Sequence, residues 1–145
     1  MVKIIESNSQ EEFQAACKVM GELRVHLTAD ELADCITRQM ATGYHLIVAM
    51  NDQDVLGTAG FWMGFKIAWG KHIYVDDLVT TGNRRSAGVG TELLDWIKEY
   101  ALANSCTQLH LDSGVQRFSA HKFYLRNGFR IASHHFSIPD LQISD

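Results

Sequence analysis

The sequence has very little proline, few cysteines and no long hydrophobic run. Its 145 residues include one proline and three cysteines, and the longest apolar run, residues 46–50, is far too short to cross a bilayer. The cysteines are widely spaced, form no CxxC pair and follow no secretory leader, which is typical of reduced thiols in a cytoplasmic protein. Repeats, low-complexity tracts and linkers are also missing. We therefore expect one globular domain, residues 1–145, in the cytoplasm and without a membrane partner.

An excess of positive charge is missing as well. The chain has 13 Lys and Arg against 17 Asp and Glu, a net charge of −4 and a pI of about 5.9. Such a field does not favour nucleic acid and mildly suits a cationic or neutral ligand. We therefore expect no nucleic-acid partner. The apolar content of 46% is sufficient for a sizeable core.

The first 40 residues predict a short strand followed by two helices. Residues 2–6 have the character of a strand. Ser9 with Glu12, and Thr28 with Glu31, each have the spacing of a helix capping box. Apolar residues then recur at helical spacing after both boxes.

The segment between the two helices, residues 22–27, is free to line a site or to be a plain surface connection. Three strands are then expected, over residues 44–50, 55–65 and 72–80. Short turns join these strands, so they are predicted to be antiparallel. Three glycines in the middle strand predict bends or bulges; they are Gly57, Gly60 and Gly64.

From Thr80 the pattern changes to alternating helices and strands. A helix is expected over residues 88–103, a strand over 108–112, a helix over 119–127 and a last strand over 129–138. A strand, helix and strand of these lengths form a right-handed crossover with parallel strands. We therefore predict an α/β (α+β) fold, in which a mixed, mostly antiparallel sheet with one parallel crossover is flanked by about four helices.

The stretch from Arg85 to Gly90 joins an apolar strand to a helix and is the first candidate for a ligand site. A helix start leaves about four backbone N–H groups unpaired and carries a partial positive charge, which makes it a ready phosphate site. Gly88 and Gly90 let an anionic ligand approach the backbone, and Arg84 and Arg85 add cationic donors.

Two common phosphate-binding motifs fit this stretch poorly. A P-loop requires a lysine directly after its last glycine, and none follows Gly90. A dinucleotide fingerprint requires a third glycine where the chain has Leu93, although Gly88, Gly90 and a suitably spaced Asp112 are present. Such folds also begin with the motif, whereas here it follows three antiparallel strands. The dinucleotide fingerprint stays open as a minor alternative.

The sequence Arg85-Ser86-Ala87-Gly88-Val89-Gly90 matches the pattern Gln/Arg-x-x-Gly-x-Gly/Ala. The strand before it ends in Asp76-Asp77-Leu78-Val79-Thr80, and the last helix carries Ala120-x-x-x-Tyr124-x-x-x-Gly128-Phe129. In all three motifs and their spacing the chain resembles the GNAT superfamily of acyl-CoA-dependent N-acyltransferases. The resemblance covers about residues 44–138.

The resemblance implies a binding mode for acetyl-CoA. Backbone groups at the strand end would pair with the pantetheine arm as if it were another strand, and a splayed strand pair at a bulge would make room for it. Backbone amides of the loop would hold the pyrophosphate. The implied cofactor-binding residues are Leu78, Val79, Thr80, Arg85, Ser86, Ala87, Gly88, Val89, Gly90 and Thr91.

The resemblance also implies two catalytic residues. Tyr124 looks like the family's general acid, because a phenol with a pKa of about 10 can protonate a departing thiolate whose pKa is about 8.5. Asp76 lies four residues before Thr80, where relatives often have a glutamate as general base. Asp77 would point to the other face of a regular strand, so only one of the two faces the substrate unless a bulge intervenes. Asp77 and water stay open as alternative bases.

Two departures from the family pattern leave questions open. Arg117 stands where relatives often have asparagine, and Ser113 and Ser119 are candidates to steady the thioester in its place. After Phe129 only about 17 residues remain, enough for one strand and a tail. The sheet is therefore either short or completed by a neighbour in a homodimer.

Histidines and aromatic residues offer further candidates. The seven histidines contain no three-ligand set with recognisable spacing, so we expect no metal. Four aromatic side chains either wall an acceptor pocket or fill the core; they are Trp62, Phe65, Trp69 and Tyr74.

The sequence thus predicts an N-acetyltransferase. It would transfer the acetyl group of acetyl-CoA to a primary amine of a small molecule or peptide, by direct attack in a ternary complex. The alternative is a non-catalytic acyl-CoA-binding regulatory module. Such a module would tolerate the loss of Tyr124 and Asp76, and their joint presence favours catalysis.

Overall fold

A computed structural model describes residues 2–52, 54–81 and 88–142 of the chain. The chain divides into two compact units, residues 1–111 and residues 112–145. Within these described residues, the first unit contains the sheet and the first three helices, and the second contains the last helix.

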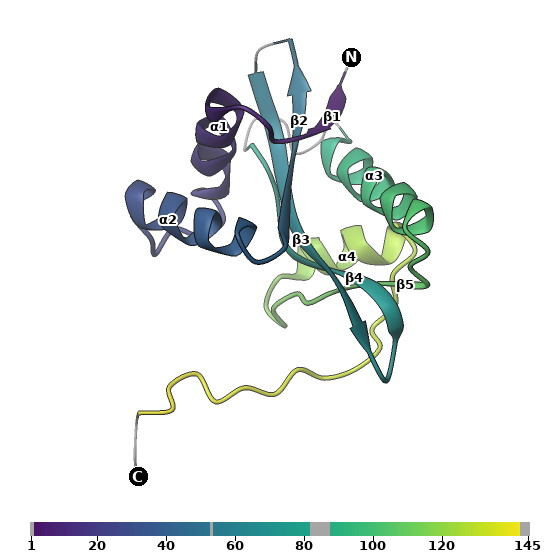
Figure 1. Ribbon diagram of the computed structural model, residues 1–145. Coiled ribbons are helices and arrows are strands. Elements are labelled where there is room, and N and C mark those ends of the chain that lie inside the picture. The colour runs from purple at the N-terminus through teal and green to yellow at the C-terminus, as the bar shows by residue number, and fades with distance from the viewer. Residues whose placement is uncertain (1, 53, 82–87, 143–145) are drawn as a thin grey trace. The chain divides into compact units, whose positions relative to one another are not determined.

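The first unit is built on a mixed sheet of five strands (Figure 1). The strands lie side by side in chain order: β1 (Lys3–Glu6), β2 (Tyr44–Asn51), β3 (Asp54–Lys66), β4 (Gly70–Thr80) and β5 (Gln108–Leu111). The first three pairings are antiparallel, and β4 pairs with β5 in parallel. Helix α3 (Val89–Ala103) connects these two parallel strands. The predicted mixed sheet with one parallel crossover is confirmed.

Helices α1 (Gln10–Met20) and α2 (Ala29–Met40) lie on one side of the sheet, and α3 lies on the other (Figure 1). The capping box of α2 is complete, since Thr28 and Glu31 each accept the other's backbone N–H. The box of α1 is only half formed. The Ser9 hydroxyl accepts the N–H of Glu12, but the Glu12 carboxylate accepts the N–H of Asn8 instead of that of Ser9.

Alternation along the strands sorts the core into two clusters, one on each face of the sheet. The face covered by α3, here the α3 face, buries Ile47, Ala49, Phe61, Ile73 and Val75 against Val89, Leu93 and Ile97. The face covered by the first two helices, here the α1/α2 face, buries Tyr44, Leu46 and Val48 against Ala16, Met20, Leu32 and Ile36.

The register of the sheet shifts twice, in both cases beside a glycine of β3. Gly57 borders the shift between β2 and β3. In the second shift Gly60 lies opposite Asp77 while Phe61 lies opposite Val75, so Asp76 is an extra residue in β4. This arrangement is a β-bulge. The glycine pattern therefore predicted two irregularities correctly, whereas Gly64 pairs regularly with His72.

The second unit contains α4 (Phe118–Arg126), close to the helix expected over residues 119–127. The strand expected over residues 129–138 is wrong, because the described part of this unit, residues 112–142, forms no strand. Three large apolar side chains of that segment are exposed; they are Ile131, Phe136 and Ile138. A strand's backbone hydrogen bonds are all made to a neighbour, so strand-forming residues alone do not make one.

Candidate active site

The carboxyl half of β4 has a strand neighbour on one side only. On the β5 side, pairing runs from His72 to Val75 and stops. On the β3 side it continues to Thr80. Among the strands that the structure describes, none pairs with residues 76–80 on the β5 side. Leu78, Val79 and Thr80 therefore belong to a strand end whose outer backbone edge has no strand partner.

The start of α3 lies beside this strand end because β3 has a glycine at position 57. A Cβ on Gly57 would lie 3.0 Å from both the carbonyl oxygen of Val79 and a methyl carbon of Val89. Both contacts are tighter than a real Cβ tolerates without movement, so the missing side chain lets the helix and the strand approach. The carboxyl end of β4 and the start of α3 are thus neighbours within the first unit.

The helix start itself has the form of an anion site. Gly88 caps α3 in the left-handed conformation, with φ +79° and ψ 8°, and it offers no side chain to the first N–H groups of the helix. Val89 and Gly90 are buried and Thr91 is half-buried. Three predicted cofactor-binding residues lie outside the described residues; they are Arg85, Ser86 and Ala87.

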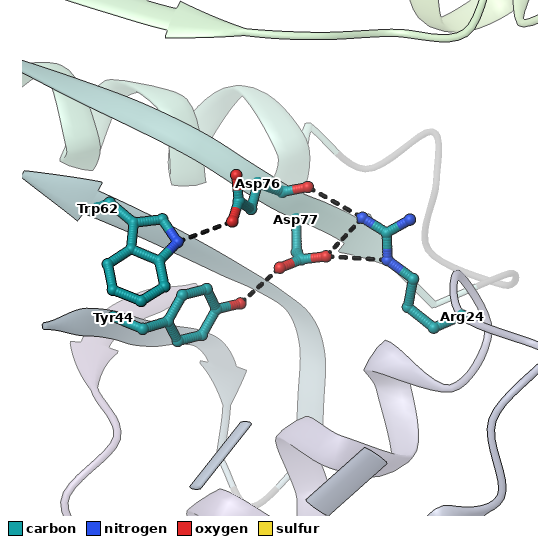
Figure 2. A network of polar contacts seen from close by, with 5 residues as sticks. All are labelled: Arg24, Tyr44, Trp62, Asp76 and Asp77. Carbon is teal, nitrogen blue, oxygen red and sulfur yellow. Dashed lines mark hydrogen bonds and ion pairs between the residues drawn. The ribbon is translucent and has the colours of Figure 1, made fainter. Parts of the chain in front are cut away.

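The two aspartates at the bulge bind different partners (Figure 2). Asp76 is exposed, and its Oδ2 accepts the indole N–H of Trp62 at 2.7 Å. Asp77 is largely buried, with its side chain 12% exposed. Its Oδ1 accepts Nε and Nη2 of Arg24 at 3.0 and 2.7 Å, and its Oδ2 accepts the hydroxyl of Tyr44 at 2.7 Å.

Both carboxylates reach side chains of the α1/α2 face. Trp62 packs on the cluster of that face, and Tyr44 belongs to it. In a regular strand, neighbouring residues point to opposite faces. The bulge removes this restriction, which is the exception that the sequence left open. Asp76 and Asp77 therefore act on one face of the sheet.

Tyr44 is a neutral hydrogen-bond donor in this network. Burial raises the pKa of Tyr44 well above its usual range, and the negative charge of Asp77 raises it further. The phenol is 3% exposed and contacts the ring of Trp62 edge to face, with ring centroids 5.6 Å apart. Its proton therefore stays on the hydroxyl and points at Asp77.

Sequence reasoning missed Arg24 and Tyr44 as partners of this pair. Arg24 lies in the segment between α1 and α2, which the sequence marked as free to line a site. The ion pair joins residues 53 positions apart, and the Tyr44 bond spans 33 positions. No local pattern carries such a pairing. For Trp62 the sequence predicted a place in the wall of an acceptor pocket or in the core, and its role as a donor to Asp76 was not predicted.

Trp62 and Tyr74 lie on the neighbouring strands β3 and β4, and Trp69 lies in the turn that joins these strands. Trp62 lies opposite Tyr74 in the register of β3 and β4, and Tyr74 stacks on Trp69 with centroids 6.2 Å apart. Trp69 also stacks on His110 at 3.5 Å. Phe65 is 78% exposed and makes no ring contact with them among the described residues. Phe65 is thus separate from this aromatic group.

Tyr124, the predicted general acid, lies on α4 in the second unit. Its ring contacts those of Phe123 and Phe129 edge to face. Burial raises the pKa of Tyr124, and the positive charge of Arg117 opposes this rise. The phenol is therefore protonated at neutral pH, as an acid must be.

The two serines proposed to steady the thioester differ. Ser119 is exposed, whereas the Ser113 hydroxyl oxygen is buried and has no hydrogen-bond partner among the described residues. His121 binds the carbonyl oxygen of Gly114 at 2.7 Å, which gives it a local structural role. The residues that the structure describes contain no group of three metal-ligating side chains. They also contain no helix that combines the length and apolarity needed for a membrane span.

The sequence matches the acetyltransferase (GNAT) family over residues 9–129. It is 31% identical over 144 residues to an uncharacterized N-acetyltransferase, YhdJ, of Bacillus subtilis, covering 96% of this chain and 99% of that protein. It is 28% identical over 94 residues to an aminoalkylphosphonate N-acetyltransferase of Salmonella typhimurium, covering 64% of this chain and 61% of that protein.

The fold is similar to that of an aminoglycoside N-acetyltransferase solved in complex with CoA. The TM-score is 0.84 at 15% identity, with 97% of this chain and 95% of that chain covered. The family match spans most of this chain and includes the carboxyl end of β4, the start of α3 and Tyr124. The chain therefore belongs to the GNAT family of acetyltransferases, as an acetyl-CoA-dependent N-acetyltransferase.

Proposed function

We propose that the protein transfers the acetyl group of acetyl-CoA to a primary amine, which attacks the thioester directly in a ternary complex. The observation that carries this proposal is the one-sided end of β4, which follows directly on the exposed Asp76. A backbone edge for the cofactor and a carboxylate for the amine thus lie within five residues, 76–80. Bound acetyl-CoA would supply the activated acetyl thioester.

The cofactor-binding residues of the proposal are those at the strand end and the helix start. Leu78, Val79 and Thr80 would pair with the amide groups of the pantetheine arm through their backbone. The amides from Arg85 to Gly90, with Thr91, would bind the pyrophosphate. The left-handed Gly88 cap supports this assignment, because among the described residues no side chain caps the first N–H groups of α3.

Asp76 is the proposed general base. An amine arrives as an ammonium ion and must lose a proton before it attacks, which a carboxylate can accept directly or through water. Asp76 is exposed, whereas both oxygens of Asp77 already accept hydrogen bonds. The side chains of Arg24, Asp76 and Asp77 together carry one net negative charge, which suits a singly charged ammonium.

Tyr124 is the proposed general acid, with its hydroxyl delivering a proton to the departing thiolate. The raised pKa of Tyr124 keeps that proton available at neutral pH. It also makes the transfer to a thiolate somewhat uphill, by ~1.4 kcal/mol for each unit of pKa difference. In the proposal, close placement of the phenol and the departing thiolate offsets this cost.

The acceptor of the proposal is a primary amine of a small molecule or peptide. Two similar proteins are named for small-molecule amines, an aminoalkylphosphonate and an aminoglycoside. The aromatic side chains of Trp62 and Tyr74, beside Asp76, offer apolar faces to the carbon chain of such an amine.

The experiment is thiol release from acetyl-CoA across a panel of amines, with the wild type against Asp76→Asn and Tyr124→Phe. We expect each variant to lower turnover about 10²- to 10⁴-fold. A Tyr124→Phe enzyme with full turnover would remove Tyr124 from the mechanism. Calorimetry with acetyl-CoA is the companion measurement. Heat of binding without turnover for any amine would instead support a non-catalytic acyl-CoA-binding regulatory module.

Three properties of the whole chain complete the proposal: a single domain, a homodimer and a cytoplasmic location. A single domain predicts one cooperative transition in calorimetry. The exposed apolar side chains of residues 129–142 favour a homodimer, which light scattering would detect. The three unpaired thiols fit a reducing compartment. Two calorimetric transitions would contradict the single domain, and a monomer at all concentrations would contradict the homodimer. Localisation in another compartment would contradict the cytoplasmic location.

A further inference from the structure

The carboxylate of Asp77 is fully committed to neighbouring side chains. Two N–H groups of Arg24 converge on one oxygen, at 3.0 and 2.7 Å, and the Tyr44 hydroxyl binds the other at 2.7 Å (Figure 2). Hydrogen bonds between ionised partners are stronger than neutral ones, and their strength increases when they are shielded from water. A carboxylate bound in this way holds other groups in place and is poorly suited to accept a proton from a substrate.

Arg24 holds both residues of the bulge at once. Its Nη2 donates to the carboxylate of Asp77 and also to the backbone carbonyl oxygen of Asp76, at 3.1 Å. The guanidinium is planar, so these bonds fix the orientation of the bulge as well as its position. Because Arg24 belongs to residues 21–28, between α1 and α2, the same bonds tie this segment to the strand beside Asp76.

Tyr44 reaches Asp77 only because position 60 is a glycine. A Cβ on Gly60 would overlap the hydroxyl oxygen of Tyr44 and would lie 2.6 Å from its Cε1. The phenol therefore crosses β3 directly over Gly60, the residue that lies opposite Asp77 in the register. Gly60 thus borders the bulge and also leaves the space through which the side chain of Tyr44 reaches Asp77.

The outcome of these contacts is the orientation of Asp76. Asp76 is the extra residue of the bulge, which lies between the register pairs Gly60–Asp77 and Phe61–Val75. Its carboxylate turns toward Trp62, whose indole N–H binds Oδ2 at 2.7 Å. Trp62 in turn contacts the ring of Tyr44. The two aspartates are therefore linked through a tyrosine and a tryptophan that touch.

We propose that Asp77, bound by Arg24 and Tyr44, is a positioning residue that holds the β4 bulge so that Asp76 faces the amine. The same ion pair ties residues 21–28 to the strand beside Asp76. The proposal rests on the proposed function, in which Asp76 accepts the proton of the amine. It assigns different roles to two adjacent residues of the same type.

The test is the variant Asp77→Asn, which keeps the size of the side chain and removes its charge. We expect kcat, per folded molecule and with an amine that the wild type acetylates, to fall about 10- to 100-fold, since a small misplacement of a reacting group has effects of this size. The KM for acetyl-CoA should stay within about twofold, because the cofactor residues lie further along the strand. The matched control is Asp95→Asn, which removes an exposed carboxylate that lies 3.9 Å from Lys98.

A second variant covers the case in which Asp77→Asn does not fold. Tyr44→Phe keeps the aromatic ring and removes one donor, and it should lower kcat about 3- to 10-fold with an unchanged KM for acetyl-CoA. Hydrogen exchange gives a readout without turnover. In either variant, amides of residues 75–77 should exchange faster than in the wild type, and those of residues 22–26 should do so in Asp77→Asn.

The outcomes separate this proposal from the one on which it rests. If Asp76→Asn loses activity while Asp77→Asn and Asp95→Asn behave like the wild type, Asp77 does not position the base. If Asp76→Asn retains full activity, the base assignment fails. If the wild type acetylates no amine, hydrogen exchange decides alone, and unchanged exchange in Asp77→Asn refutes the anchoring role.

Discussion

Gly60→Ala is the substitution whose effect the structure defines most sharply. The new methyl group would overlap the hydroxyl oxygen of Tyr44 and lie 2.6 Å from its Cε1. Tyr44 is 3% exposed and packed in the cluster of the α1/α2 face, so its ring cannot swing into solvent. Either β3 and β2 move apart or the phenol leaves its place, and in both cases its bond to Asp77 is lost.

The size of the effect follows from three contributions to the free energy of unfolding. Overpacking of a core costs about 1–3 kcal/mol. Loss of a hydrogen bond to a charged group costs about 1.5–3 kcal/mol. Replacing glycine by alanine lowers the entropy of the unfolded chain and returns about 0.4–1 kcal/mol, since Gly60 is not among the glycines with positive φ. We expect a net destabilisation of about 2–5 kcal/mol.

Urea unfolding followed by tryptophan fluorescence measures this loss, since Trp62 contacts Tyr44. Gly64→Ala is the matched control, because it lies on the same strand and its Cβ would meet His72 at an ordinary 3.4 Å. The cost of Gly60→Ala should also be smaller when Tyr44→Phe is already present, since the bond to Asp77 is then absent from both proteins. If Gly60→Ala and Gly64→Ala have equal stabilities, Tyr44 does not cross β3 at Gly60.

Three further predictions concern the titration of Tyr44, the cap of α2 and the reactivity of the cysteines. Burial raises the pKa of Tyr44 above its ordinary 10.0, so above pH 10 the native state keeps a proton that the unfolded chain releases. The free energy of unfolding should then fall by ~1.4 kcal/mol per pH unit. Urea titrations of Tyr44→Phe should lack this contribution. Thr28→Ala should cost about 1 kcal/mol through loss of the α2 cap, whereas exposed Thr37→Ala, in the same helix, should be neutral or slightly stabilising. With a thiol reagent, exposed Cys35 should react at once and buried Cys106 only on unfolding; equal rates would contradict the packing of the α3 face.

Local sequence patterns predicted most of the first unit correctly. Capping boxes and helical spacing predicted α1 and α2, and short turns predicted the antiparallel pairing of β2, β3 and β4. Gly57 and Gly60 marked the two register shifts. These features are readable because each depends on neighbours within a few residues along the chain or on one face of one element.

The failed prediction concerns the segment over residues 129–138. Its composition favours a strand, yet none forms there in the described residues. A helix satisfies its backbone internally, so α4 could be predicted from its own residues. A strand depends on an available edge elsewhere, which local composition does not report.

The sequence by itself determined the fold class, the family motifs and the presence of two adjacent aspartates at the end of a strand. Only the tertiary structure decided how those aspartates differ. Asp77 binds an arginine 53 positions away and a tyrosine 33 positions away, while Asp76 binds Trp62. The physical reason is that a side chain's role depends on which partners the fold brings within about 3 Å, and hydrogen bonds of that length join residues without regard to their separation along the chain.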